Sequence, residues 1–119
     1  FLNTQGEIAR KGYEWTHCLY GFSKLGVVLP NARALGVGAG REPIIFWLAD
    51  RIEHVTATDL YGNETWAGYR DAEAPAEILK DSSKFCARSF NIERVSFQLA
   101  DGTNLPFGDN AFDFCWSMS

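Results

Sequence analysis

The sequence has few of the residues that metal sites and disulfide frameworks need. Its 119 residues include three cysteines, Cys18, Cys86 and Cys115, which lie far apart and form no C-x-x-C pair. Only two histidines, His17 and His54, are present. An odd number of scattered cysteines indicates buried thiols in a reducing compartment rather than disulfides or a zinc site, and Cys115 in particular lies in an apolar stretch. We therefore expect no metal and a cytoplasmic location.

Long apolar runs and an excess of positive charge are also missing. The longest strongly apolar run, residues 44–49, is much too short to cross a bilayer, which takes about 20 residues. No charged-then-apolar signal segment opens the chain. The net charge of -4 argues against a phosphate backbone as the main partner, because such binding needs clustered Lys and Arg. We expect neither a membrane nor a nucleic-acid partner.

The sequence does have enough apolar material for a hydrophobic core. Hydrophobic residues make up 46% of the chain and aromatic residues 14%, which is sufficient for one domain. The chain opens on Phe1 and stops at Ser119, directly after an apolar stretch. We therefore expect a fragment of a longer protein.

Apolar spacing and turn residues predict helices that alternate with strands. An amphipathic helix is expected over residues 7–28, where Gly12 and Gly21 favour two shorter helices. The further expected elements are strands at 32–37, 54–60, 94–100 and 111–118, helices at 43–52 and 75–90, and an irregular aromatic segment at 61–74. This alternation predicts an α/β fold, a doubly wound, Rossmann-like, mostly parallel sheet with helices on both faces.

A glycine-rich turn follows the first expected strand. The stretch ALGVGAGREP, residues 34–43, places Gly36, Gly38 and Gly40 where absent side chains let the backbone approach a ligand. Asp59 ends the second expected strand, 21 positions after Gly38. At that distance an acidic residue commonly accepts hydrogen bonds from ribose hydroxyls. These features predict an adenosine-containing ligand at the carboxyl ends of the strands.

A second segment makes the pattern more specific. Asp101 ends the third expected strand, within ADGTNLPFGDNAFD at residues 100–113. With the glycine turn and Asp59, it resembles the class I S-adenosylmethionine-dependent methyltransferases. That family pairs a V-G-x-G turn with an acid after the second strand, and carries an A-D-x-x-x-L-P-F-x-D-x-x-F-D segment. The resemblance covers residues 32–119, and implies S-adenosylmethionine as the cofactor and the strand order 3-2-1-4. In this interpretation residues 1–31 are an N-terminal helical segment, and the α/β half is truncated after the fourth strand.

The resemblance also implies roles for individual residues. Gly38, Ala39 and Gly40 would pass under the methionine part of the cofactor. Asp59 would bind both ribose hydroxyls, and Leu60 would pack on the adenine.

Further contacts are implied beyond the second strand, and two positions of the turn depart from the family. Asp101 would accept from the adenine amino group with the help of the Gly102 backbone, and Ser117 would lie by the sulfonium and the methyl acceptor. Many members have an acid where Gly36 stands and a glycine where Glu42 stands. Here the two residue types are exchanged, although both positions still belong to the expected cofactor-binding turn.

Glu42 bears on which cofactor the turn holds. A helix N-terminus attracts phosphate, so a carboxylate there would repel the pyrophosphate of NAD or FAD. S-adenosylmethionine has no phosphate, and its sulfonium and ammonium groups would be favoured by a carboxylate. The neighbouring Arg41 could neutralise Glu42 or bind an anion itself. Two interpretations of Glu42 stay open, a cofactor contact and a favourable first-turn helix residue.

The predicted function is transfer of a methyl group from S-adenosylmethionine to an unidentified acceptor, expected to be a small molecule. The catalytic residues and the oligomeric state are unknown, and this chain alone is expected to be inactive. One alternative is an NAD(P)-binding oxidoreductase domain, which would share the glycine turn and Asp59. Another is a non-catalytic methyltransferase-like binding module or an inactive fragment, whose unpaired fourth strand would promote self-association.

Overall fold

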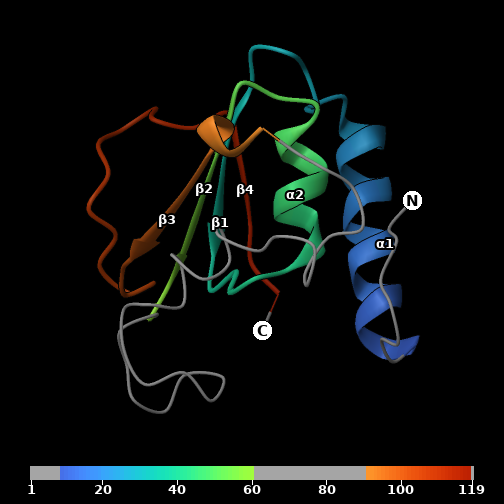
Figure 1. Ribbon diagram of the computed structural model, residues 1–119, viewed down its shortest axis with the longest axis horizontal. Helices are drawn as coiled ribbons and strands as arrows, with labels where there is room; N and C mark the ends of the chain where they lie inside the picture. The colour runs from blue at the N-terminus through green and yellow to red at the C-terminus, as the bar shows by residue number, and fades with distance from the viewer. Residues whose placement is uncertain (1–8, 61–90, 119) are drawn as a thin grey trace.

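Four parallel strands form the sheet that positions the rest of the chain. The computed structural model describes residues 9–60 and 91–118 (Figure 1). The strands are β1 (Arg33–Val37), β2 (His54–Asp59), β3 (Val95–Leu99) and β4 (Phe114–Trp116). Their spatial order is β3-β2-β1-β4, and every neighbouring pair is parallel. The predicted order and the Rossmann-like α/β fold are therefore confirmed.

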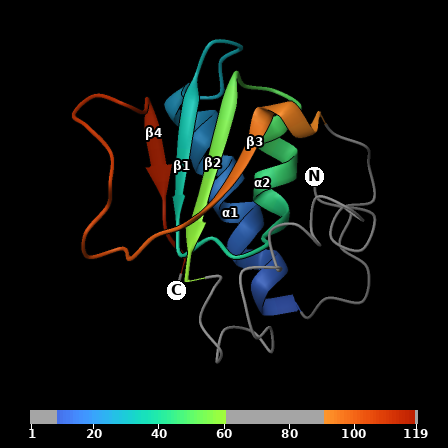
Figure 2. The same cartoon turned by 60° about the vertical axis from the view of Figure 1, so that its left-hand side comes forward.

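Two helices cover one face of this sheet. They are α1 (Ala9–Leu25) and α2 (Pro43–Ala49), which lie together behind the strands in Figure 2. A short 3-10 helix, η2 (Ile92–Arg94), leads into β3. The predicted helix at 75–90 and the irregular segment at 61–74 lie outside the described residues.

The predicted N-terminal helix is present as α1, and the alternative of two shorter helices is wrong, because α1 is continuous across Gly12 and Gly21. Its buried side chains Trp15, Leu19 and Phe22 join the main hydrophobic core. Tertiary packing of this apolar face outweighs the cost of about 1 kcal/mol for each helical glycine. The N-terminal helical segment thus shares one core with the sheet.

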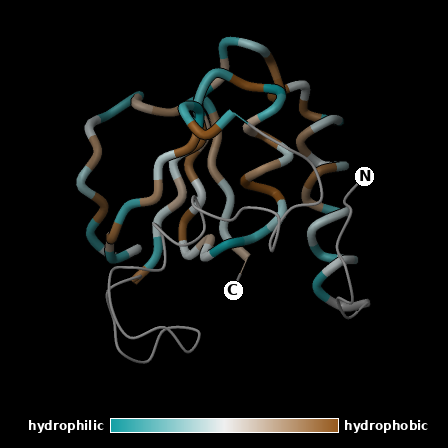
Figure 3. The backbone as a smooth tube through the Cα atoms, in the orientation of Figure 1, coloured by the Kyte–Doolittle hydropathy of each residue, from teal (hydrophilic) through white to brown (hydrophobic). Residues whose placement is uncertain are grey.

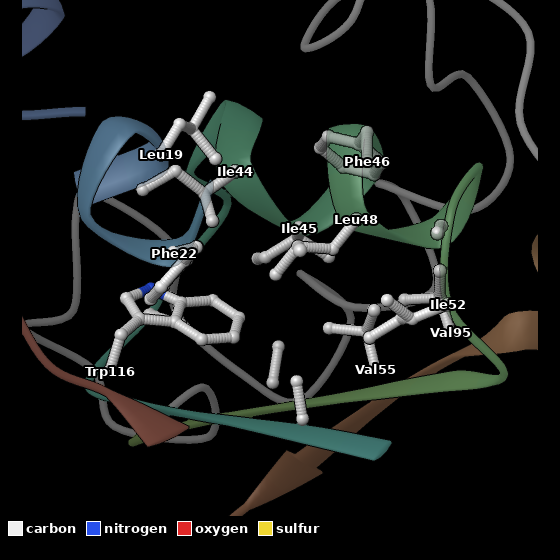
Figure 4. Close-up of a cluster of buried hydrophobic side chains, with 14 of the residues drawn as sticks. Leu19, Phe22, Ile44, Ile45, Phe46, Leu48, Ile52, Val55, Val95 and Trp116 are labelled. Atoms are coloured by element: carbon white, nitrogen blue, oxygen red, sulfur yellow. The ribbon is translucent and has the colours of Figure 1, made fainter. Parts of the chain in front are cut away.

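The core lies between the helices and the sheet. In Figure 3, hydrophobic residues lie along the strands and α2, and Figure 4 shows the side chains that meet between them. In α2, Ile44, Ile45, Phe46 and Leu48 are all buried. The helix ends at Ala49 rather than at residue 52 as predicted, although Ile52 still packs fully into the core. Neither described helix is long and apolar enough to cross a bilayer.

Strand β4 is shorter than the predicted strand at 111–118. Ahead of it, Asp113 accepts a hydrogen bond from Arg33 N at 2.8 Å through its side chain, and its own N–H donates to Arg33 O at 2.8 Å. The Asp113 carboxylate thereby takes the place of a backbone carbonyl as the acceptor for Arg33 N. The two bonds stand next to the first pair of the β1–β4 register, Ala34 opposite Phe114. Cys115, predicted to be buried, is exposed.

Candidate functional site

The glycine turn leaves β1 at the carboxyl end of the sheet. Gly38 and Gly40 have φ angles of 65° and 52°, a conformation that favours glycine because other L-residues rarely adopt it. A Cβ on Gly38 would meet nothing within 4 Å, so the chain around this residue is open. Ala39 is buried, and its N–H donates to Thr58 O at 2.9 Å. The turn is therefore attached to β2 through its backbone.

Asp59, the last residue of β2, is a second connection between the turn and the sheet. Its Oδ2 accepts from Gly40 N at 2.9 Å and its Oδ1 from Leu60 N at 2.7 Å. Leu60 is 43% exposed, so its apolar side chain is accessible beside this carboxylate. The predicted proximity of Gly40, Asp59 and Leu60 is present, whereas their roles toward a cofactor stay predictions.

The end of β3 brings Asp101 to the same edge of the sheet. Ala100 N donates to Asp59 O at 3.1 Å, and a Cβ on Gly102 would come within 3.1 Å of Val37 Cγ1. Asp101 is exposed, and its Oδ1 accepts from both the N–H and the hydroxyl of Thr103, at 2.8 and 2.7 Å. These bonds lower the pKa of Asp101, the backbone bond most, because they stabilise the charged form. The segment is thus a hydrogen-bonded turn that carries an ionised carboxylate.

Glu42 lies at the other side of the turn, at the N-cap of α2. Its side chain makes no capping hydrogen bond to α2. Instead, Oε2 accepts from Nε1 of Trp116, 74 positions later, at 3.0 Å. Burial raises the pKa of Glu42 to about 7, and the nearby carboxylates of Asp59 and Glu14 add to this increase.

The Trp116 contact is the part of the site that sequence reasoning missed. Trp116 is 5% exposed and stands opposite Gly36 in the pairing of β1 with β4. The predicted site residue Ser117 follows it directly, beyond the end of β4, and is exposed. No short motif links Trp116 to Glu42, because the contact depends on the sheet order. One sign of this residue's burial is visible in the sequence, the apolar run around residue 116.

The histidine His17 lies on helix α1 and is exposed. Its ring contacts that of Tyr13, with 4.2 Å between the ring centroids, and both side chains are exposed. In the described ranges no group of His, Cys, Asp and Glu could hold a metal ion.

The turn amides fit a cofactor that carries no phosphate. Three of them are already bonded to protein acceptors: Ala39 N to Thr58 O, Gly40 N to Asp59 Oδ2, and Glu42 N to Ala39 O at 3.1 Å. Pro43 has no N–H to offer. A pyrophosphate would therefore compete for occupied donors between two carboxylates, whereas ribose hydroxyls and cationic groups would find acceptors.

An α/β sheet with a glycine turn and an acid at the end of β2 defines the class of Rossmann-like nucleoside-binding proteins. Within it, the chain belongs to the methyltransferase-domain family, whose model matches residues 35–119. This confirms the family inferred from the glycine turn and the Asp101 segment. It also confirms S-adenosylmethionine as the cofactor, since it is the cofactor of this family.

Solved structures of the same fold agree with this assignment. The YcgJ protein from Bacillus subtilis has a TM-score of 0.59 at 20% identity, over 86% of this chain and 37% of that one. The cyclase SpnF has a TM-score of 0.60 at 20% identity, over 98% of this chain and 38% of that one. Phosphoethanolamine N-methyltransferase 1 from Haemonchus contortus, in complex with phosphoethanolamine and S-adenosylhomocysteine, has a TM-score of 0.51 at 14% identity. There the match covers 98% of this chain and 27% of the other.

This chain therefore spans less than two fifths of the length of each of these structures. No curated protein matches it.

Proposed function

We propose that this chain provides the cofactor half of an S-adenosylmethionine-dependent methyltransferase that acts on a small molecule. The observation that carries the proposal is the carboxylate of Asp59, bonded to Gly40 N at the open glycine turn. Bound S-adenosylmethionine would supply an electrophilic methyl group, and the chain's residues would bind and orient it.

Asp59 is suited to hold the ribose. A carboxylate offers about four acceptor positions, and two amide donors occupy only part of that capacity. Because those two amides fix the plane of the carboxylate, its orientation is set before the ligand binds. The exposed Leu60 supplies an apolar surface beside it for the adenine.

Asp101, Gly102 and Ser117 complete the proposed set. The ionised Asp101 can accept from the adenine amino group through Oδ2, since both Thr103 bonds go to Oδ1.

Catalysis would rest largely on holding the methyl donor and the methyl acceptor in line at close distance. No general base is needed for this proposal, and we assign none.

A small-molecule acceptor is supported by analogy with the structural neighbour that was solved with phosphoethanolamine. Since a likeness at 14% identity shows only the fold, the small-molecule acceptor is our proposal and no particular substrate is inferred. The acceptor atom is left open for the same reason.

Calorimetric titration with S-adenosylhomocysteine, run beside NAD, tests the proposal. We expect saturable binding of S-adenosylhomocysteine and none of NAD. Binding of NAD alone would instead support the oxidoreductase alternative. A folded chain that bound neither ligand would favour the non-catalytic alternative.

A reaction other than methyl transfer is a second candidate function with one specific point in its favour. A cyclase is among the similar structures, so this fold also serves another reaction. Because this chain alone is expected to be inactive, the assay needs a protein that joins it to the acceptor-binding part of a methyltransferase domain. Mass spectrometry of S-adenosylmethionine incubated with that protein and a panel of small amines and alcohols separates the two. Stoichiometric S-adenosylhomocysteine and methylated product are expected for the transferase.

A further inference from the structure

The indole ring of Trp116 occupies the space that a side chain at position 36 would need. A Cβ on Gly36 would lie 2.5 Å from Cζ2 and 2.8 Å from Cη2 of Trp116, and 2.8 Å from the Cβ of Ala39. Figure 4 shows the indole reaching from β4 to Phe22 of α1, with 6.2 Å between the ring centroids. Because the ring is held on these sides, an acidic side chain at position 36 cannot coexist with it. This packing gives a physical reason for the exchange of residue types between positions 36 and 42.

The same ring holds the carboxyl group of Glu42. A buried indole N–H usually finds an acceptor, and Trp116 donates to Glu42 Oε2 at 3.0 Å. Trp15, by contrast, has a buried Nε1 with no partner within the described residues. The Trp116 bond therefore orients a carboxyl group that would otherwise rotate freely in front of α2.

Charged groups from several elements act on this carboxyl group. Helix α1 contributes Lys11 and Glu14, which form an ion pair at 3.1 Å, and β2 contributes Asp59. The Trp116 bond and Lys11 favour the ionised form of Glu42, whereas burial, Asp59 and Glu14 disfavour it.

On the same helix, the Cys18 thiol stays neutral, because burial and Glu42 raise its pKa to about 11. Arg41 adjoins Glu42 in the chain. Since the pKa of Glu42 is raised to about 7, a nearby cation would complete its ionisation near neutral pH.

The geometry points to Trp116 as a positioning residue that presents the Glu42 carboxylate to the ammonium group of S-adenosylmethionine. This inference rests on the proposed function and deepens it, because it makes cofactor binding dependent on proton release from Glu42. On binding, the proton leaves the Glu42 carboxyl for the buffer, and the ammonium takes its place as the neutralising partner. Affinity then rises with pH across the range in which free Glu42 ionises.

The contact can be tested first in the ligand-free protein. The indole N–H signal of Trp116, assigned by its absence in Trp116→Phe, is followed by NMR from pH 5 to 9. We expect it to titrate with a midpoint near the Glu42 pKa of about 7, and to stop titrating in Glu42→Gln. A signal that does not depend on Glu42 would overturn the positioning role, whether or not any ligand binds.

The cofactor step is tested by calorimetry with S-adenosylhomocysteine between pH 6 and 8. In the wild type we expect affinity to increase roughly tenfold over this range, as the ionised fraction of Glu42 rises. Glu42→Gln should flatten the profile. Trp116→Phe removes the bond that favours ionisation, so its profile should move to higher pH. Trp47→Phe, which changes a tryptophan stacked on Arg51 at 3.9 Å, is the matched control and should keep the wild-type profile.

A second ligand tests whether the pH dependence of affinity comes from the ammonium group of S-adenosylhomocysteine. Methylthioadenosine has the same nucleoside but no amino acid group, so its affinity should not vary with pH. If no folded variant binds either ligand, the proposed function fails. If S-adenosylhomocysteine binds with a pH profile that is flat, or that Trp116→Phe leaves unchanged, the inference is wrong and the proposed function stands.

Discussion

The backbone N–H of Gly40 donates to Oδ2 of Asp59 at 2.9 Å, which joins the glycine turn to the end of the neighbouring strand. The other oxygen of the same carboxylate accepts from Leu60 N at 2.7 Å. A side chain predicted to bind ribose therefore also holds together the two segments that form the site. Its substitution should affect both binding and stability.

Replacing Asp59 with Asn should weaken S-adenosylhomocysteine binding at least about tenfold, since a charge-assisted hydrogen bond is worth roughly 1.5–3 kcal/mol. The amide can accept at one position only, and its NH₂ group would face one of the two N–H donors. We therefore also expect a loss of about 1–2 kcal/mol in the free energy of unfolding, measured in urea. Asp109→Asn, in the exposed 100–113 segment, is the control and should change neither quantity. Unchanged affinity in Asp59→Asn would remove Asp59 from the site.

Gly36→Ala should destabilise the protein by about 1–3 kcal/mol through overpacking. The new Cβ would meet the Trp116 ring at 2.5 Å and Ala39 Cβ at 2.8 Å, neither of which can move freely. Gly21→Ala is the matched control, because a Cβ there meets nothing within 4 Å and lies within helix α1. The control should gain about 0.5–1 kcal/mol. Urea denaturation of both variants measures the contrast, and equal effects would contradict the close packing at Gly36.

The parts of the site that sequence could predict are those determined by neighbouring residues. Gly38 and Gly40 follow an apolar strand. Their positive φ angles are ones that glycine adopts readily and other residues rarely do. Asp59 ends β2 and Asp101 comes shortly after β3, and parallel strands bring their carboxyl ends to one edge. Strand order itself came from the family resemblance rather than from spacing.

The parts that sequence could not predict depend on contacts between distant segments. Glu42 and Trp116 are 74 positions apart, and only the pairing of β1 with β4 brings them together. Cys115 is exposed although its neighbours are apolar, because successive strand residues face opposite sides and only one face carries the described helices (Figure 2). Helix α1 stayed intact across two glycines because its packing outweighs local propensity.

The two described cysteines should differ in reactivity. Burial raises the pKa of Cys18 to about 11, whereas Cys115 is exposed. Since the thiolate is the reactive form, Cys18 should react at pH 8 on the order of a hundredfold more slowly than a thiol of ordinary pKa near 8.5. Reaction with a disulfide reagent in a Cys86→Ser background should therefore show one fast and one slow thiol. Peptide mapping that found Cys18 modified first would contradict the burial of that side chain.

The free energy of unfolding should depend on pH through Glu42. Its pKa rises from an ordinary value of 4.5 to about 7 in the folded protein, so the folded state binds more protons between these values. The stability that this protonation contributes is complete below pH 4.5 and is lost as pH rises through about 7. The full effect is on the order of 3 kcal/mol.

Glu42→Gln should therefore have a shallower decline in stability between pH 5 and 8 than the wild type. Above pH 7 the variant should be the more stable protein, although it binds S-adenosylhomocysteine more weakly. Urea denaturation at intervals of half a pH unit measures both curves, and their difference isolates Glu42 from groups such as His54, whose pKa burial lowers. Parallel curves would mean that Glu42 ionises normally, and its carboxyl group would then be solvated rather than held against Trp116.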